Sequence, residues 1–122
     1  MRFLGGLERL LEKQITRKFV MSFLDIIVMT VLNNTPMYGY GVMAAIHKEF
    51  GVLLSPGTLY PLLHSLEERK LIEASRDGGK IVYQATSKGR QKFRGTLDTF
   101  SLAIQKVSSF IKEQNKEIVL PV

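Results

Sequence analysis

The chain gathers most of its excess positive charge in one short window, and clustered cations are suited to binding phosphates. Between Arg76 and Arg94 there are six Lys and Arg residues and one acid, Asp77, so this window carries +5 of the formal net charge of +6. Arg76 and Lys80 flank an Asp-Gly pair, which favours a tight turn, and side chains at a turn can reach the phosphates or the minor groove of a duplex. Lys88 lies farther along, at the root of the next predicted helix, where it can touch the same backbone. Localised basicity of this kind favours a polyanion partner over a solubilising surface.

A second candidate surface combines small polar side chains with an aromatic ring. In segment 55–71 leucines recur at helical spacing on one side, which leaves Thr58, Tyr60 and His64 among the residues on the other side. Threonine and serine hydroxyls can bond base edges or phosphates, the Tyr60 hydroxyl can bond a phosphate, and the amino end of a helix attracts phosphate. A partly buried position in the core is an equally favoured interpretation of Tyr60.

Residue types that support catalysis or metal binding are not arranged to do so. The chain has no Cys, and its two histidines, His47 and His64, lie on different predicted helices. No Gly-x-Ser-x-Gly sequence and no Gly-rich phosphate loop occurs. We therefore expect no enzyme activity, no metal and no cofactor.

Composition predicts one compact domain in a reducing compartment. Of the 122 residues 45% are hydrophobic and 23% are charged, and the lack of Cys gives no sign of an oxidising environment. The most apolar stretch, 19–32, contains Asp25 and is shorter than the roughly 20 apolar residues that a bilayer core takes. Glu8 and Glu12 interrupt the first apolar run, which argues against a secretory signal, and they offset the neighbouring cations that anionic lipid would attract. We expect a cytoplasmic protein without a membrane partner.

The first third of the chain is predicted to form two helices. The segment Leu4–Ile15 places apolar residues at three- and four-residue steps with charges between them, so it forms an amphipathic helix that needs a partner to cover it. The second helix opens at Ser22, whose hydroxyl would cap it, with Asp25 beside the positive helix end. It ends near Asn34, before Pro36.

Two further helices are predicted to form a pair. The third covers about twelve residues and ends at Gly51, where a left-handed C-cap is expected. Ser55 and Pro56 supply an N-cap and a first-position proline for the fourth helix, whose leucines continue to Leu71. Pro61 lies inside this helix, so either its first turn is irregular or the helix kinks.

A β-hairpin and a long helix are predicted to complete the chain. Two β-rich stretches, 72–75 and 81–85, flank the Asp77-Gly78 turn signal, which predicts a two-stranded hairpin. From Ser87 the chain is helical, and its apolar residues between Phe93 and Ile111 step by four, three, four, three and four, as in a heptad seam. This seam spans ~28 Å, which is long for so small a domain to cover, so a two-fold dimer would bury both this helix and the first one.

The fold class is therefore mainly α with a small β-hairpin, in the order of a winged helix-turn-helix domain, whose second paired helix enters the major groove of DNA. We expect four parts: an N-terminal amphipathic helix extension at 1–18, the winged helix-turn-helix domain at 19–86, a C-terminal dimerisation helix at 87–114 and a flexible tail at 115–122. A winged arrangement also serves in protein-interaction modules without sequence-specific DNA binding, and this alternative stays open. In that case Arg76 and Lys80 would pair with acidic side chains.

Several short motifs resemble those of the PadR family of transcriptional regulators. They are Gly39-Tyr40 at a helix start, the run Ser-Pro-Gly-Thr-Leu-Tyr-Pro-Leu-Leu from Ser55 to Leu63, Leu66-Glu67 followed by Leu71-Ile72, and Tyr83-x-x-Thr86-x-x-Gly89. The resemblance covers about residues 22–112. The run that begins at Ser55 and the run that ends at Gly89 are far more specific than the order of elements alone.

The resemblance implies a homodimeric repressor that reads a near-palindromic operator in double-stranded DNA, one arm per subunit. With His64 and Lys88 added from the surfaces above, the expected DNA-binding residues are Tyr40, Ser55, Gly57, Thr58, Tyr60, His64, Arg76, Lys80 and Lys88. The expected dimer interface consists of Leu7, Leu11, Phe93, Leu97, Phe100, Ile104, Val107 and Ile111. Pro61 matches the family's own proline, which implies a built-in irregularity.

Two features depart from the usual family pattern. About 18 residues precede the helix that usually opens the domain, and this extension would enlarge the dimer interface. Some members bind aromatic or drug-like effectors at the dimer centre, sometimes against a tryptophan of the last helix. This chain has no Trp, so Phe93, Phe100 and Phe110 would be the substitute aromatics for a small aromatic effector.

Overall fold

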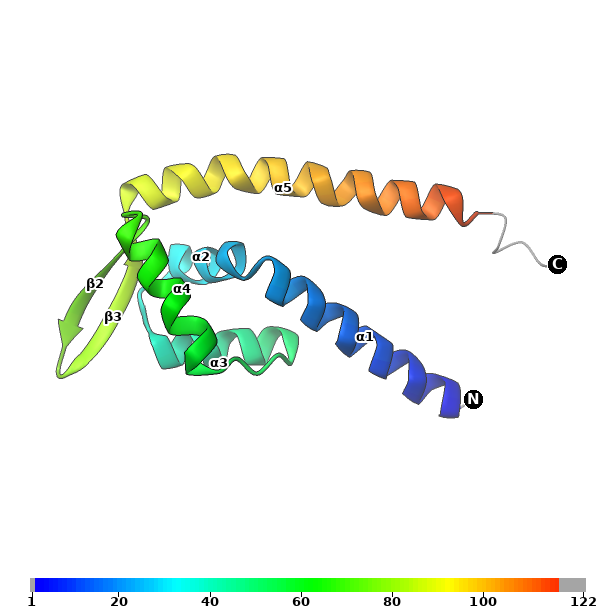
Figure 1. Cartoon of the computed structure of the whole chain (residues 1–122), viewed down its shortest axis with the longest axis horizontal. Helices are drawn as coiled ribbons and strands as arrows, with labels where there is room; N and C mark the ends of the chain where they lie inside the picture. The colour runs from blue at the N-terminus through cyan, green and yellow to red at the C-terminus, as the bar shows by residue number, and fades with distance from the viewer. Residues whose placement is uncertain (1, 117–122) are drawn as a thin grey trace.

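In the computed structural model, which describes residues 2–116, the elements follow the predicted order with one strand added (Figure 1). The helices are α1 (Arg2–Ser22), α2 (Leu24–Asn34), α3 (Gly39–Phe50), α4 (Pro56–Glu68) and α5 (Ser87–Gln114). The strands are β1 (Met37–Tyr38), β2 (Ile72–Asp77) and β3 (Lys80–Ala85). The predicted class, mainly α with a small β-hairpin and a long last helix, is confirmed. Most of the predicted tail, 115–122, lies outside the described residues.

The hydrophobic core lies between α2, α3, α4 and the sheet. α2 and α4 bury their apolar residues at three- and four-residue steps, as the periodicity predicts. Within the described side chains of α1, Val20 is the one that is fully buried, and α5 contributes the buried Gly89 and the half-buried Phe93. Most of α1 and α5 therefore projects from the domain as two arms (Figure 1).

The sheet has three strands in the order β1-β3-β2, so the predicted two-stranded hairpin is present as β2 and β3, and β1 was not predicted. β1 pairs antiparallel with β3, with Met37 opposite Tyr83 and Tyr38 opposite Val82. A two-residue strand has no periodicity of its own, because it exists only through pairing with a distant segment. β2 and β3 meet at Gly78-Gly79, whose φ angles of 56° and 85° fit a type I′ turn, so the predicted tight turn is present.

The break between α1 and α2 lies at Phe23, so the predicted cap by Ser22 was wrong. Ser22 is the last residue of α1, and Phe23 occupies the N-cap position without a side-chain hydrogen bond to α2. The Phe23 ring instead packs edge-on against Phe100 of α5, with the ring centres 4.8 Å apart. This tertiary contact stabilises the bend, and the apolar stretch 19–32 is divided between two helices.

Two helix ends near the hairpin position α4 and α5. α4 ends at Glu68 rather than near Leu71, because Lys70 adopts a left-handed conformation (φ 61°) and the Leu71 N–H bonds back to the Leu66 carbonyl. α5 begins at Ser87, as predicted, and is capped by Thr86, whose hydroxyl accepts from the Gly89 N–H at 2.9 Å. The same hydroxyl donates to the Lys70 carbonyl at 2.7 Å, which ties the start of α5 to the end of α4.

Candidate nucleic-acid interface

The amino end of α4 and the tip of the β2-β3 hairpin lie on the same edge of the domain, whereas α5 runs along the opposite edge (Figure 1). Most of the residues expected to bind DNA are exposed, and Thr58 and Tyr60 are half-buried. The hairpin tip carries Arg76 and Lys80, both exposed. The fold therefore brings the start of α4 and the cationic hairpin to one surface.

The outermost side of α4 changes character along its length. Gly57, Pro61, His64 and Glu68 follow one another at steps of four, three and four, and all four are exposed. The helix runs through Pro61 as one element, although the proline has no N–H to give to the Gly57 carbonyl. Because Glu68 would repel a phosphate, an anionic partner fits the first two turns of α4 and not its carboxyl end.

Ser55 and Thr58 have a structural task at the start of α4. The Ser55 hydroxyl accepts from the Thr58 N–H at 3.2 Å, and the two side-chain oxygens lie 3.1 Å apart. This confirms the predicted N-cap. The Ser55 oxygen is thus already engaged within the fold, although the side chain stays exposed.

Tyr60 packs against the first residue of α3. The ring lies so close to Gly39 that a Cβ there would be 2.8 Å from its Cζ atom. Together with the three other tyrosines, it lines a cleft of about 380 Å³, whose walls also include Lys80 and Ile81. Burial raises the pKa of the Tyr83 phenol, with smaller contributions from Tyr60 and Glu67, so this ring stays uncharged at neutral pH. The half-buried ring of Tyr60 combines a packing role with a position beside α3 and the hairpin.

Arg76 and Lys80 lie on opposite faces of the hairpin. Directly paired residues share a face of a sheet, and successive residues alternate between faces. Arg76 pairs with Ile81, on the face that carries the buried Tyr83, whereas Lys80 pairs with Asp77 on the other face. The two cations can therefore serve different phosphates but not the same one from one side.

The cations at the root of α5 are engaged with helix ends. The Lys88 ammonium donates to the Arg69 carbonyl at 3.4 Å, and the Arg90 guanidinium donates to the Asn33 carbonyl at 3.3 Å. The Arg69 carbonyl lies directly after α4 and the Asn33 carbonyl lies in the last turn of α2. Both are at carboxyl ends of helices, where the helix dipole is negative. Because the 13 residues of α4 span about 20 Å, Lys88 lies far from the start of that helix, and the structure does not bring it to the remaining expected residues.

Sequence reasoning missed Tyr38, which joins β1 to the hairpin tip. Its hydroxyl donates to the Asp77 carboxylate at 3.0 Å, and the Lys80 ammonium lies 5.1 Å from the ring centre. The hydrogen bond to Asp77, with the negative charge of the same carboxylate, raises the pKa of Tyr38. The available signal was a tyrosine directly before the Gly39-Tyr40 helix start.

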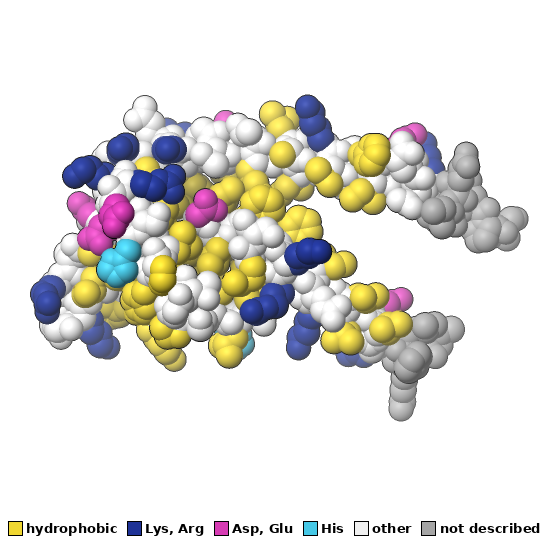
Figure 2. Space-filling model, viewed as in Figure 1, with side chains coloured by type: hydrophobic (Ala, Val, Ile, Leu, Met, Phe, Trp, Pro, Cys, Tyr) yellow, Lys and Arg dark blue, Asp and Glu magenta, His cyan; other side chains and the backbone are white. Residues whose placement is uncertain are grey.

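The residues expected at a dimer interface divide into two groups. Phe93 and Phe100 pack on their own domain. The other six are 40 to 57% exposed, and they are Leu7, Leu11, Leu97, Ile104, Val107 and Ile111. α1 and α5 diverge and border an apolar cleft of about 480 Å³, and apolar side chains follow both arms beside the open gap (Figures 1 and 2). Of the three aromatics expected to hold an effector, Phe100 lines this cleft, whereas Phe93 and Phe110 do not.

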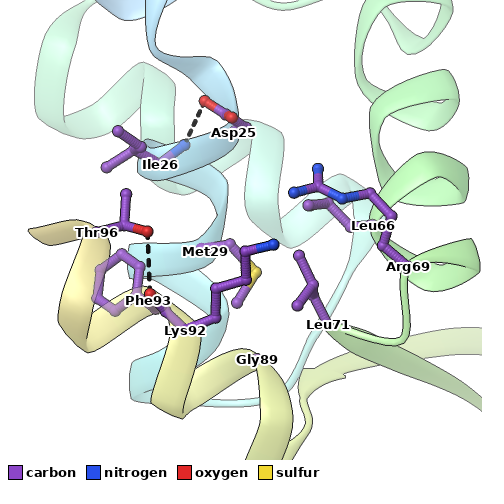
Figure 3. Close-up of a pocket in the computed structure, with 10 residues that line it drawn as sticks. All are labelled: Asp25, Ile26, Met29, Leu66, Arg69, Leu71, Gly89, Lys92, Phe93 and Thr96. Carbon is purple, nitrogen blue, oxygen red and sulfur yellow. Dashed lines mark hydrogen bonds between the residues drawn. The ribbon is translucent and has the colours of Figure 1, made fainter.

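A smaller pocket, of about 60 Å³, marks the junction of α2, α4 and α5 (Figure 3). The charged ends of Asp25, Arg69 and Lys92 border it, and Gly89 lies beside Leu71. A space of this size holds a water molecule or two rather than an organic ligand. Across residues 2–116, no three His, Asp or Glu side chains are grouped to hold a metal ion. Nor does any helix in that part of the chain have the length and apolar character to cross a membrane.

The chain is similar to known proteins in sequence and in fold. Residues 28–95 match the family model described as the transcriptional regulator PadR-like family. No curated protein is significantly similar in sequence. A solved transcriptional regulator from Clostridium thermocellum has a TM-score of 0.71 at 19% identity, over 78% of this chain and 96% of that one. A PadR-like transcriptional regulator from Bacillus cereus has a TM-score of 0.71 at 22% identity, over 78% of this chain and 97% of that one. A PadR family transcriptional regulator from Eggerthella lenta has a TM-score of 0.67 at 21% identity, over 92% of this chain and 98% of that one.

Proposed function

Since the chain belongs to the PadR-like family, whose members are DNA-binding transcriptional regulators and not enzymes, we propose that it is a homodimeric repressor of a near-palindromic operator. One observation carries the proposal. The start of α4 and the cationic hairpin share one edge of the domain, and the apolar arms project away from the hairpin on the other side (Figure 1). DNA binding and dimerisation are thus assigned to separate surfaces of the domain.

In this proposal the first two turns of α4 enter the major groove, and the hairpin, the wing of the domain, follows the adjacent backbone. Arg76 and Lys80 neutralise phosphates from the two faces of the wing. Lys88 is an outer phosphate contact. The remaining proposed contacts lie at the start of α3 and along the exposed side of α4, and they are Tyr40, Ser55, Gly57, Thr58, Tyr60 and His64.

The dimer forms through the arms. The six exposed apolar residues of the expected interface are covered by a second copy, with α5 (the dimerisation helix, 87–114) and the extension at 1–18 both contributing. The two recognition helices then lie about 34 Å apart, one turn of the duplex, or a multiple of it. The apolar cleft between α1 and α5 is the proposed place for a small aromatic effector, against Phe100.

The decisive experiment is the selection of bound duplexes from a random-sequence pool by the purified chain at ~150 mM salt, because specificity depends on salt. An enriched inverted repeat supports the dimeric repressor and supplies its operator. Binding without any enriched sequence contradicts operator recognition. No binding at all contradicts the proposal and favours a winged-helix module that recognises a protein.

A further inference from the structure

Asp77 is the single acid in the cationic window, and it lies at the tip of the proposed DNA-binding wing. A carboxylate repels the phosphates of a duplex, so its own charge opposes binding there. Its carboxylate, however, accepts a hydrogen bond from the Tyr38 hydroxyl at 3.0 Å. The position of Asp77 therefore points to a role in the shape of the wing.

The contact crosses all three strands of the sheet. Tyr38 belongs to β1 and pairs with Val82 of β3, Lys80 lies two residues before Val82 on the same face, and Asp77 of β2 pairs with Lys80. The Tyr38 side chain thus reaches over β3 to the last residue of β2. On its way it passes under the Lys80 ammonium, 5.1 Å from the ring centre and within the range of a cation–π interaction.

The outer half of the hairpin has little else to hold it. β1 pairs only with Val82 and Tyr83, so it ends before the tip, and Arg76, Asp77, Lys80 and Ile81 are all exposed. In the described part of the chain, the Tyr38 hydroxyl makes the one side-chain hydrogen bond that joins the tip to another element. A hairpin joined at two glycines is otherwise free to twist.

We propose that Tyr38 is a positioning residue for DNA binding, which fixes the tip of the wing through the Asp77 carboxylate and holds Lys80 ready for a phosphate. This rests on the proposed function, because the wing must contact DNA for its position to matter. Tyr38 adjoins Gly39 at the start of α3, so the contact also sets the wing relative to the paired helices. Pre-positioned cations bind more tightly because less freedom is lost on association.

The test is a double-mutant cycle on binding of a mixed-sequence DNA duplex. Tyr38→Phe keeps the ring and loses the hydroxyl, so we expect affinity to fall about threefold to tenfold. The dependence of affinity on salt stays unchanged, because no cation is removed. In an Asp77→Ala background the same substitution has no further effect, whereas in an Asp77→Asn background, which keeps an oxygen acceptor, it still weakens binding. Glu73→Gln, which removes an acid from the same strand away from the tip, is the matched control for charge.

A second measurement reports how often the tip of the wing opens in the absence of DNA. Amide hydrogen exchange at Lys80, which pairs with Asp77 across the turn, is expected to be faster in Tyr38→Phe and in Asp77→Ala, to the same extent, and unchanged in Glu73→Gln. Unchanged exchange in Tyr38→Phe, or an equal loss of affinity in both Asp77 backgrounds, overturns the proposal even when the chain binds DNA well. If the unmodified chain binds no duplex, the proposed function fails and the role of Tyr38 in binding fails with it, whereas the exchange result still shows whether the contact holds the wing.

Discussion

Gly89 of α5 lies directly against the main-chain carbonyl of Leu71, so close that a Cβ on Gly89 would overlap the carbonyl oxygen. The same oxygen accepts from the Thr86 N–H at 3.1 Å. Thr86 in turn caps α5 through the Gly89 N–H. The Tyr-x-x-Thr-x-x-Gly motif therefore has a physical reason, since its threonine starts the long helix and its glycine lets that helix approach the end of α4 (Figure 3).

Gly89→Ala is expected to lower the free energy of unfolding by about 1 to 3 kcal/mol, because the backbone of Leu71 must move. Gly95→Ala is the matched control on the same helix. It meets no atom within 4 Å, so it should raise stability by about 0.5 to 1 kcal/mol through helix propensity. Urea denaturation of both variants measures the difference, and equal stabilities would contradict the close packing.

Ser55 can be tested for its two roles separately. Ser55→Ala removes the N-cap of α4 and should cost about 1 kcal/mol in the free energy of unfolding. Ser55→Asp keeps a capping oxygen, so stability should be close to that of the unmodified chain, but the added charge should weaken DNA binding. Thermal unfolding and duplex binding are measured side by side, with the exposed Ser65→Ala as control. Full DNA affinity in Ser55→Asp would exclude a phosphate near Ser55.

Local signals were enough to predict much of the scaffold. Gly51 and Ser55-Pro56 each determine the conformation of their own few residues, and the corresponding helix ends are present. The Asp77-Gly78 signal predicted the turn to within one residue, because Gly78 and Gly79 occupy its centre and Asp77 pairs with Lys80. Features that depend on distant partners were missed. β1 exists through β3, and the break at Phe23 is stabilised by Phe100, so neither has a signal within its own segment.

The same limit applies to the candidate site. Charge counting identifies the cationic window, but two of its cations, Lys88 and Arg90, bond to carbonyls of other elements. Register, which requires the paired strand, places Arg76 and Lys80 on opposite faces. Composition alone cannot separate cations that are free to bind a partner from cations that close a helix end.

Lys80→Ala should make DNA binding less steeply dependent on salt. Each neutralised phosphate contributes about −0.9 to the slope of log affinity against log salt, and we expect a slope of roughly −5 to −7 for the dimer. The loss of one contact per subunit makes this slope about two units shallower. Lys106→Ala, in the outer half of α5, should leave the slope unchanged. Titrations of one duplex at several salt concentrations provide the slopes, and an unchanged slope in Lys80→Ala would remove Lys80 from the interface.

Ile104→Glu should separate the subunits without unfolding the domain. Ile104 is 42% exposed on the α5 arm, so the charge is tolerated in one chain but is costly when a second copy covers it. We expect the dimer dissociation constant to rise about 30-fold or more, and operator binding to fall with it. Gln105→Glu, one residue along and outside the heptad seam, is the control. Sedimentation equilibrium measures the dimer dissociation constant, and an intact Ile104→Glu dimer would contradict dimerisation through this seam.

The pKa of Tyr38, raised above 10.0 by its hydrogen bond to Asp77, makes this contact sensitive to alkali. A folded-state pKa above the unfolded value means that the contribution to stability is fully present below pH 10 and is lost as the pH rises through the raised value. Asp77→Ala, which removes both the acceptor and its negative charge, should therefore lower the titration midpoint of one tyrosine toward 10. Phenolate absorbance against pH measures it. Tyr83, whose pKa is raised by burial, should not move.

The 28-residue α5 is about 42 Å long, yet it rests on its own domain along its first half, through Gly89, Phe93 and Phe100. The second half, about 21 Å long, therefore extends beyond these contacts as a lever whose fulcrum lies near Phe100. A tilt of about 10° at this fulcrum displaces the far end by about 4 Å, which is close to one base-pair step of about 3.4 Å along a duplex. If two such helices set the distance between the recognition helices of a dimer, a small change in the packing around Phe100 alters that distance. The dimer then no longer matches the spacing of the operator half-sites.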